Sequence, residues 1–232
     1  MIKLITFDLD DTLWDNGPVI RRAIHEGYSW LLEYCPDLAN MHDIASLDLL
    51  KDKIKNSTPD LEHRVSESRI VGIQQALQSI GYESSIARTI AKEAFTRFHH
   101  WRHQVELFGD AKETIAQLAQ EYRLGIITNG NADVNRLGLG EFFEFTVNSE
   151  DMNRSKPDPE MFHHALKLAG VRPKQAIHIG DNLITDVRGA AEIGMKTVWF
   201  NPDGKPIGKD DTVPDFTVKT LAEIPAAIRQ NR

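Results

Sequence analysis

Hydrophobic and polar positions follow two different rhythms along the chain. Residues 2–8 form a short apolar run that ends in an aspartate, which indicates a buried strand. From residue 17 to about residue 105, apolar residues instead recur every three or four positions, for example at Ile20, Ile24 and Tyr28. This spacing is typical of amphipathic helices, and it predicts a bundle of about four helices.

After this helical segment, short apolar runs alternate with segments of helical periodicity. Strands that alternate with helices of about 10–15 residues imply right-handed β-α-β units and a mainly parallel sheet. A stretch rich in Gly, Pro and Asp, residues 201–214, predicts a loop, and a final helix is expected near the C-terminal end. The predicted strands are 123–128, 143–147, 175–180, 196–200 and 215–218, and the predicted helices are 109–121, 158–169 and 182–193.

The first strand has no neighbour in the helical segment, so it is expected to join the later strands in one sheet. The sequence therefore predicts an α/β fold with a Rossmann-like parallel-sheet core. Residues 1–15 and 106–232 are assigned to this core domain, and residues 16–105 to an inserted all-helical domain.

The composition narrows the class of protein. The chain has 232 residues, 41% of them hydrophobic and 26% charged, as in an ordinary globular protein. Its net charge of −7 disfavours nucleic acid or an anionic membrane as the main partner, because both require a basic face. The single cysteine, Cys35, excludes an intramolecular disulfide, and no apolar run has the length of a membrane span. The first strand leaves no room for a signal peptide, so a cytoplasmic protein is expected.

Three acidic residues, Asp8, Asp10 and Asp11, lie within four positions at the end of the first strand. Neighbouring anions repel one another and are costly to remove from water, so they are tolerated where a cation or a reaction needs them. This cluster points to metal-assisted phosphoryl chemistry.

Polar residues also follow two later strands, as Thr128-Asn129-Gly130 and Gly180-Asp181-Asn182. Taken singly, each has a simpler explanation as a helix cap or a turn. Ligands of an open parallel sheet, however, bind at the carboxyl ends of the strands, where all of these residues would meet. Their coincidence at one edge favours a functional site.

Four short motifs resemble those of the haloacid dehalogenase superfamily of phosphohydrolases. They are Asp-x-Asp-x-Thr at residues 8–12, Thr128 at the end of the next core strand, Lys156 ahead of a helix, and Gly-Asp with a second acid at residues 180–186. Each motif alone is weak, but the four in this order are specific, and the resemblance covers the whole chain.

Phosphoryl transfer needs a nucleophile, a counter-charge and a proton donor, and the resemblance assigns these roles in the same way. Asp8 would attack phosphorus and form an aspartyl-phosphate. Asp10 would protonate the leaving group and then activate the water that releases phosphate. Asp8, Asp181 and the backbone carbonyl of Asp10 would hold Mg²⁺, which prefers oxygen ligands.

The remaining motif residues would bind phosphate or support the site. The Thr128 hydroxyl and the amides of Asn129 and Gly130 would cradle the phosphate oxygens, and Lys156 would supply positive charge. The alternative for Lys156 is a solvated surface lysine. Asp186 would hold a metal-bound water or orient Lys156. Asn182 is likewise expected to support the site without binding the metal directly.

In this superfamily, a helical insertion after the first motif is a cap that selects the substrate, so residues 16–105 are expected to form such a cap. Most of its polar and aromatic residues are expected to be ordinary helix surface or core. Candidates for contact with substrate are Trp14, Arg21, Arg22, His63, Arg64, Arg69, Trp101 and Arg102.

Longer segments resemble a narrower group, the bacterial phosphatases that act on flavin mononucleotide (FMN) and on 5-amino-6-(5-phospho-D-ribitylamino)uracil of riboflavin biosynthesis. These segments are FDLDDTLWDNGPVI, ITNGNAD with LGLGEFFEF, and SKPDP. The expected partner is thus a small phosphorylated metabolite, and the chain is expected to be a monomer or a homodimer.

Several alternatives stay open. Relatives hydrolyse nucleoside monophosphates or sugar phosphates, and a phosphomutase shares the fold. A dehalogenase does not need Asp10, so its presence argues against that activity. A non-catalytic binding module would be expected to lack at least one of Asp8, Asp10, Lys156 and Asp181, and all four are present.

Overall fold

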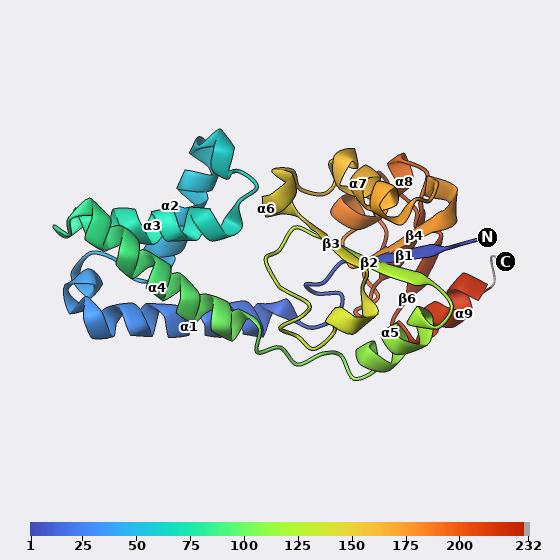
Figure 1. Cartoon of the computed structure of the whole chain (residues 1–232), viewed down its shortest axis with the longest axis horizontal. Helices are drawn as coiled ribbons and strands as arrows, with labels where there is room; N and C mark the ends of the chain where they lie inside the picture. The colour runs from blue at the N-terminus through green and yellow to red at the C-terminus, as the bar shows by residue number, and fades with distance from the viewer. Residues whose placement is uncertain (230–232) are drawn as a thin grey trace. The chain divides into compact units, whose positions relative to one another are not determined.

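The computed structural model describes residues 1–229 and divides into two compact units (Figure 1). Met1–Asp15 and the chain from Glu106 onward form one unit, and Asn16–Val105 forms the other. None of the helices described between residues 1 and 229 combines the length and apolarity needed to cross a membrane.

The first unit is built on a six-stranded sheet in the order β3-β2-β1-β4-β5-β6, in which every neighbouring pair is parallel. This confirms the predicted α/β class with a parallel sheet. All four residues of strand β1 are buried, as expected of a strand that is covered on both faces. The strands are β1 (Leu4–Phe7), β2 (Arg123–Thr128), β3 (Phe145–Asn148), β4 (Ala176–Gly180), β5 (Lys196–Phe200) and β6 (Phe216–Val218).

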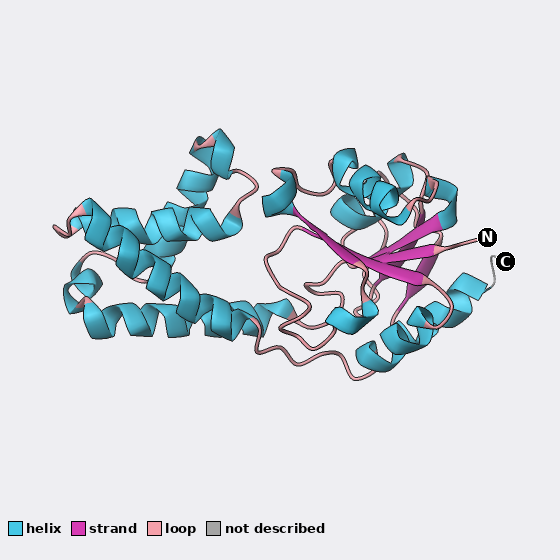
Figure 2. Cartoon of the chain, in the orientation of Figure 1, coloured by secondary structure: helices cyan, strands magenta, loops and turns pink. Residues whose placement is uncertain are grey.

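Helices cover both faces of this sheet (Figure 2), with α5 and α9 on one side and α7 and α8 on the other. The face beneath α7 holds a hydrophobic core that includes Met161, Phe162 and Leu166 from the helix and Ile127 from the sheet. The helices of this unit are α5 (Ala111–Ala119), α6 (Ser149–Met152), α7 (Pro159–Ala169), α8 (Gly189–Glu192) and α9 (Ile224–Arg229).

Helix α7 shows why the sequence signals were reliable where they were local. The side chain of Asp158 caps the helix by accepting a hydrogen bond from the Glu160 backbone N–H at 2.9 Å, and Pro159 occupies the first turn. Gly170 ends the helix at a φ of 62°, a conformation that glycine adopts at little cost. The predicted helix at residues 158–169 is therefore confirmed.

Two predicted elements were wrong in detail. The continuous helix at residues 182–193 is instead a π-helical turn (Leu183–Arg188) followed by α8. Its first turn is wider than an α-helical turn, because the Asn182 backbone carbonyl accepts hydrogen bonds from the backbone N–H groups of both Asp186 at 3.0 Å and Val187 at 3.2 Å. The Asn182 side chain caps this turn by accepting from the N–H groups of Ile184 and Thr185. The strand predicted at 143–147 begins only at Phe145, since a short helical turn (Gly140–Phe142) precedes it.

The second unit is entirely helical over its described length, as the three-to-four-residue periodicity predicted. Helix α1 packs against α4, and α3 packs against both α2 and α4. Small and aliphatic side chains such as Leu31, Leu77 and Ala91 fill the centre. The helices are α1 (Asn16–Tyr34), α2 (Ile44–Ser57), α3 (Val65–Ser79) and α4 (Ser84–Arg102).

Three of the residues proposed as substrate contacts have structural positions instead. Trp14 belongs to the first unit and is fully buried, and Arg102 is only 1% exposed. Arg69 forms an ion pair with Asp48 at 3.3 Å and lies over the Phe98 ring at 4.3 Å. These contacts indicate packing roles within each unit, which helical periodicity alone does not distinguish from surface positions.

Candidate active site

The strand order brings the predicted site residues to one edge of the sheet. Strand β1 lies between β2 and β4, with Phe7 paired to both Ile126 and Ile179. The Asp8 backbone N–H donates to the Ile179 carbonyl at 2.8 Å, so Asp8 leaves β1 beside Gly180. The carboxyl ends of the central strands therefore meet, as expected for the ligand-binding edge of a parallel sheet.

Lys156 lies between two carboxylates of this edge. Its Nζ donates to Asp8 Oδ1 at 2.7 Å and to Asp186 Oδ1 at 2.6 Å. The residue is only 3% exposed, so the alternative of a solvated surface lysine is wrong. Burial alone would lower the pKa of Lys156, but the charges of Asp186 and Asp8 outweigh it and raise the pKa, which keeps the ammonium charged.

The Asn129 side chain holds the backbone of Lys156 through two hydrogen bonds. Asn129 Nδ2 donates to the Lys156 carbonyl at 3.0 Å, and the Lys156 N–H donates to Asn129 Oδ1 at 2.7 Å. Ser149 Oγ donates to the Asn129 carbonyl at 3.0 Å, and Thr128 Oγ1 accepts from the Gly130 N–H at 3.0 Å. The segment after β2, predicted only to bind phosphate, thus also positions the lysine.

The Asp186 carboxylate is fixed by donors from three segments. Besides Lys156, His178 Nε2 lies 3.2 Å from Oδ1, and the Asn182 backbone N–H donates to Oδ2 at 3.0 Å. Lys156 and His178 outweigh the effect of burial and hold the pKa of Asp186 below its usual range. Among the predicted roles, this geometry favours orientation of Lys156.

Gly180 is required by this arrangement. A Cβ atom added at position 180 would lie 2.3 Å from Cγ and 2.4 Å from Oδ2 of Asp186. Real carbon atoms do not approach so closely, so any larger residue would displace the carboxylate. The glycine of the Gly-Asp motif therefore lets Asp186 pack directly against the strand end.

Carboxylate oxygens of Asp8, Asp181 and Asp186 lie within 4.8 Å of one another. Burial, together with the charges of Asp186 and Asp10, outweighs the lowering effect of Lys156 and raises the pKa of Asp8 to about 8. Burial, Asp186 and Asp11 raise the pKa of Asp181 to about 7. Such a set of mutually repelling oxygen donors fits a hard divalent cation, which would remove the repulsion. Asp186 already accepts three hydrogen bonds, so Asp8 and Asp181 are the better placed ligands.

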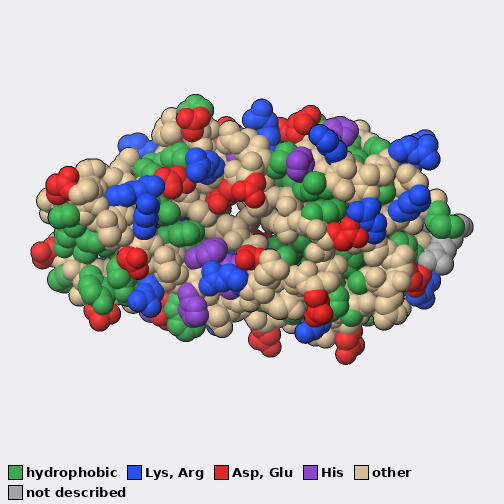
Figure 3. Space-filling view, viewed as in Figure 1, with side chains coloured by type: hydrophobic (Ala, Val, Ile, Leu, Met, Phe, Trp, Pro, Cys, Tyr) green, Lys and Arg blue, Asp and Glu red, His purple; other side chains and the backbone are tan. Residues whose placement is uncertain are grey.

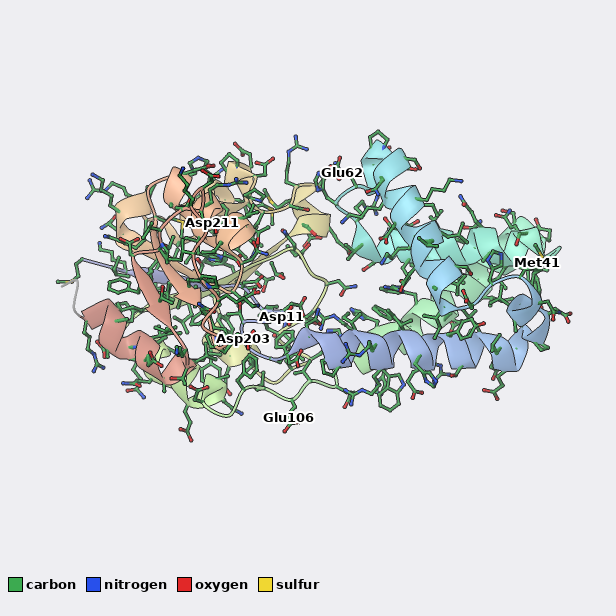
Figure 4. The ribbon with its side chains drawn as sticks, turned by 180° about the vertical axis from the view of Figure 1, so that it is seen from behind. Asp11, Met41, Glu62, Glu106, Asp203 and Asp211 are labelled. Atoms are coloured by element: carbon green, nitrogen blue, oxygen red, sulfur yellow. The ribbon has the colours of Figure 1, made fainter. Side chains whose placement is uncertain are left out.

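A hollow of about 380 Å³ opens beside Asp181. It has acidic, aromatic and basic side chains, and Figure 4 shows two of the acids, Asp11 and Asp203, lying close together. The Asn201 side chain fixes the backbone of Lys205 at the border of this hollow. Asn201 Nδ2 donates to the Lys205 carbonyl, and the Lys205 N–H donates to Asn201 Oδ1, both at 2.9 Å. The other lining residues are Asp15, Phe108, Phe200 and Pro202.

The turn after β1 carries the second acid of the first motif. Asp10 is half-buried, and its charge contributes to the raised pKa of Asp8. Asp11 is exposed and has a φ of 60°, an uncommon backbone conformation for a residue other than glycine. Asp11 thus lies in the turn after β1, and it also lines the hollow.

Two buried members of this network, His178 and Thr6, were not among the residues predicted from the sequence. Thr6 Oγ1 lies 2.8 Å from His178 Nδ1, and both residues are 1% exposed or less. Each stands inside a predicted core strand, where apolar neighbours hide a polar side chain. Each strand shows one polar residue among apolar ones, but only the structure shows that Thr6 and His178 lie opposite each other on adjacent strands.

Comparisons with known proteins agree with this geometry. A family model described as haloacid dehalogenase-like hydrolase matches residues 2–194. The Escherichia coli K12 protein named 5-amino-6-(5-phospho-D-ribitylamino)uracil phosphatase YigB is 36% identical over 202 residues, which cover 87% of this chain and 84% of that protein.

Two solved structures extend the comparison. A crystal structure titled 2-haloacid dehalogenase, from Pseudomonas syringae pv. tomato DC3000, superposes with a TM-score of 0.95 at 40% identity and covers all of both chains. The magnesium-bound hydrolase YfnB of Bacillus subtilis has a TM-score of 0.67 at 22% identity, covers 98% of this chain and 99% of its own, and supports the fold alone. The chain belongs to the haloacid dehalogenase-like hydrolases, as its motifs predicted, and is therefore a hydrolase.

Proposed function

We propose that this protein is a Mg²⁺-dependent phosphatase that hydrolyses a small phosphate monoester through an aspartyl-phosphate at Asp8. The observation that carries the proposal is the buried Lys156 ammonium, shared between Asp8 and Asp186 beside the carboxylate of Asp181. It combines a nucleophile, a fixed positive charge and a donor set for a cation within one edge of the sheet.

The reaction has two steps. A carboxylate oxygen of Asp8 attacks phosphorus, the bond from phosphorus to the leaving oxygen breaks, and Asp10 donates a proton to that oxygen. A water molecule then attacks phosphorus and gives its proton to Asp10, which releases inorganic phosphate and restores Asp8. An acid–base group in such a position contributes about 10²–10⁴ in rate.

The other residues bind and orient the phosphoryl group. Lys156 would offset the charge of Asp8 as the anionic substrate approaches. The Thr128 hydroxyl and the backbone amides of Asn129 and Gly130 would bind the phosphate oxygens, with the Gly130 N–H exchanging its contact with Thr128 Oγ1 for one with phosphate. Asp8, Asp181 and the Asp10 carbonyl would hold Mg²⁺, and the cation supplies positive charge for the transferring group.

The candidate substrates are FMN and 5-amino-6-(5-phospho-D-ribitylamino)uracil. Support comes from the E. coli relative that is named for the second compound. The hollow of about 380 Å³ beside Asp181 offers room for the part of the substrate that carries the phosphate. Nucleoside monophosphates and sugar phosphates are the alternative substrates within the same reaction.

Dehalogenation is the second candidate, because the structure with a TM-score of 0.95 is titled a 2-haloacid dehalogenase. Displacement of halide from a 2-haloacid needs no divalent cation, so it would leave the mutually repelling acids Asp8, Asp181 and Asp186 without an ion to hold. Dehalogenation also leaves Asp10 without a task. These residues favour phosphoryl transfer.

One set of assays separates the two functions. Phosphate release is measured from FMN, the ribitylaminouracil phosphate, nucleotides and sugar phosphates with Mg²⁺ or with EDTA, and chloride release is measured from 2-chloropropionate. The proposal requires phosphate release that EDTA abolishes and that Asp8→Asn loses, while Asp210→Asn, a change on an exposed loop, leaves it intact. Chloride release without phosphate release would overturn it.

A further inference from the structure

We infer that His178 is a positioning residue: together with Thr6, it fixes the Asp186 carboxylate and so sets the place of the Lys156 ammonium against Asp8. This inference rests on the proposed function, because its kinetic readout is phosphate release. It assigns a role in the same site to two buried polar residues, Thr6 and His178, which lie inside the sheet and not at its edge.

Thr6 and His178 lie side by side inside the sheet, where water does not reach them. Thr6 and His178 are directly paired on the adjacent strands β1 and β4. Both are buried, and the His178 ring meets the edge of Phe162 with the two ring centres 5.3 Å apart. A buried imidazole needs partners for both of its nitrogen atoms, since an unpaired polar group removed from water is destabilising.

The proton positions follow from the partners. Burial lowers the pKa of His178, so the ring is neutral and carries one N–H. The ionised Asp186 only accepts hydrogen bonds, so Nε2 carries the proton and donates to Oδ1 at 3.2 Å. Nδ1 is then an acceptor and receives the Thr6 hydroxyl proton at 2.8 Å. The alternative acceptor for that hydroxyl, the Ile177 carbonyl, is more distant at 3.4 Å.

The hydrogen bonds of this pair continue through Asp186 and Lys156 to the proposed nucleophile Asp8. Oδ1 of Asp186 receives both the His178 N–H and the Lys156 ammonium, and the same ammonium donates to Asp8. A rotation of the Asp186 carboxylate would therefore move the charge that stabilises the phosphoryl group. His178 and the Asn182 backbone N–H hold the carboxylate from two sides and oppose that rotation.

The competing explanation is that His178 only fills space beneath α7. Three replacements distinguish the two roles. His178→Phe keeps a ring against Phe162 but loses both nitrogen atoms. His178→Gln can place an N–H where Nε2 lies, and His178→Asn places its amide near Nδ1 only. A packing role ranks Phe as the mildest change, whereas a positioning role ranks Gln as the mildest.

The experiment measures kcat and KM for phosphate release with Mg²⁺, together with thermal unfolding of each variant. We expect His178→Phe and His178→Asn to lower kcat by about 10–100-fold with little change in KM, as for the loss of a group that orients a site residue. His178→Gln should recover most of kcat. Thr6→Val, which keeps the shape of Thr6 but removes its hydroxyl, should lower kcat by a smaller factor.

A measurement without turnover tests the hydrogen bonds directly. In protein labelled with ¹⁵N-histidine, His178 should give one protonated nitrogen, Nε2, and Thr6→Val should weaken this preference. If the wild type releases no phosphate, the proposed function fails while the NMR result still tests the pair. If the wild type is active and His178→Phe retains full kcat, or if Nδ1 carries the proton, the inference is overturned.

Discussion

Replacement of Lys156 by methionine tests the buried ion pairs most severely. Methionine keeps much of the side-chain volume but removes the ammonium that lies 2.6 Å from Asp186 and 2.7 Å from Asp8. Loss of one partner of a buried pair costs about 3–5 kcal/mol, because it leaves an uncompensated charge. The variant should therefore be folded but markedly less stable, and inactive.

The size of this loss should depend on pH, with a sign that the structure fixes. In the wild type the pKa of Asp186 is below its usual range, so its stabilising effect is present above the unfolded pKa and is lost in acid. In the variant that pKa rises, and the carboxyl can escape the charge by taking a proton. Protonation costs about 1.4 kcal/mol per pH unit above an ordinary carboxyl pKa of about 3.9, so the part of the loss that comes from protonation of Asp186 is about 5 kcal/mol at pH 7.5 and about 2 kcal/mol at pH 5.5.

The assay is urea unfolding of wild type and Lys156→Met at both pH values without metal. Lys209→Met, on an exposed loop, is the matched control and should change the free energy of unfolding by less than about 0.5 kcal/mol. A loss below about 1 kcal/mol at pH 7.5, the range of exposed ion pairs, would refute the buried position of the ammonium. So would a loss that is larger at pH 5.5 than at pH 7.5.

Three further predictions concern the same edge of the sheet. Gly180→Ala should push the Asp186 carboxylate aside, destabilise the fold by about 1–3 kcal/mol in chemical unfolding and abolish most activity, whereas Gly109→Ala, where nothing lies within 4 Å of the added carbon, should not alter activity. Asn129→Ala should lower kcat by about tenfold or more in phosphate-release assays, because it frees the Lys156 backbone. Mg²⁺ binding should tighten from about pH 6 to pH 8 and release protons, measurable by calorimetry in buffers of different ionisation enthalpy, because the metal displaces protons from carboxyl groups with raised pKa values.

Local sequence signals predicted much of the fold. The apolar run at β2 was placed correctly at both ends, and Asp158 with Pro159 marked the start of α7. Such elements depend on neighbouring residues, so their pattern is visible in one segment. The π-helical turn after β4 was missed because it combines a wider backbone hydrogen bond, from the Val187 N–H to the Asn182 carbonyl, with a contact of the buried Asp186 carboxylate to the Asn182 N–H.

The candidate site was predictable where parallel-sheet geometry brings strand ends together. Asp8 and Asp181 were predicted to meet because both follow strands of a parallel sheet, and the structure brings their carboxylates together. Parallel-sheet geometry alone gave no indication that the Asn129 side chain would pair with the Lys156 backbone, 27 positions along the chain, or that Thr6 would meet His178. Those contacts depend on strand order and register, which no single segment encodes.

Charge was a weaker guide than position. The net charge of −7 disfavoured nucleic acid or an anionic membrane as the main partner. On the face drawn in Figure 3, Lys and Arg side chains are interspersed with Asp and Glu. The net charge did not reveal that a single lysine would be buried among acids. Because Lys156 is buried, its ammonium interacts more strongly with the nearby carboxylates than an exposed lysine would at the same distance.

In the proposed reaction Asp8 becomes covalently bound to phosphorus, and trapping of this intermediate would detect that bond. Asp10→Asn is mixed with p-nitrophenyl phosphate, whose leaving group departs without an acid, so that the first step proceeds while the second lacks its base. The account predicts a burst of one nitrophenolate per enzyme. Acid quenching and borohydride reduction should then convert residue 8 alone to homoserine, as detected by peptide mass spectrometry. Steady turnover without a burst and without modification at residue 8 would contradict the account.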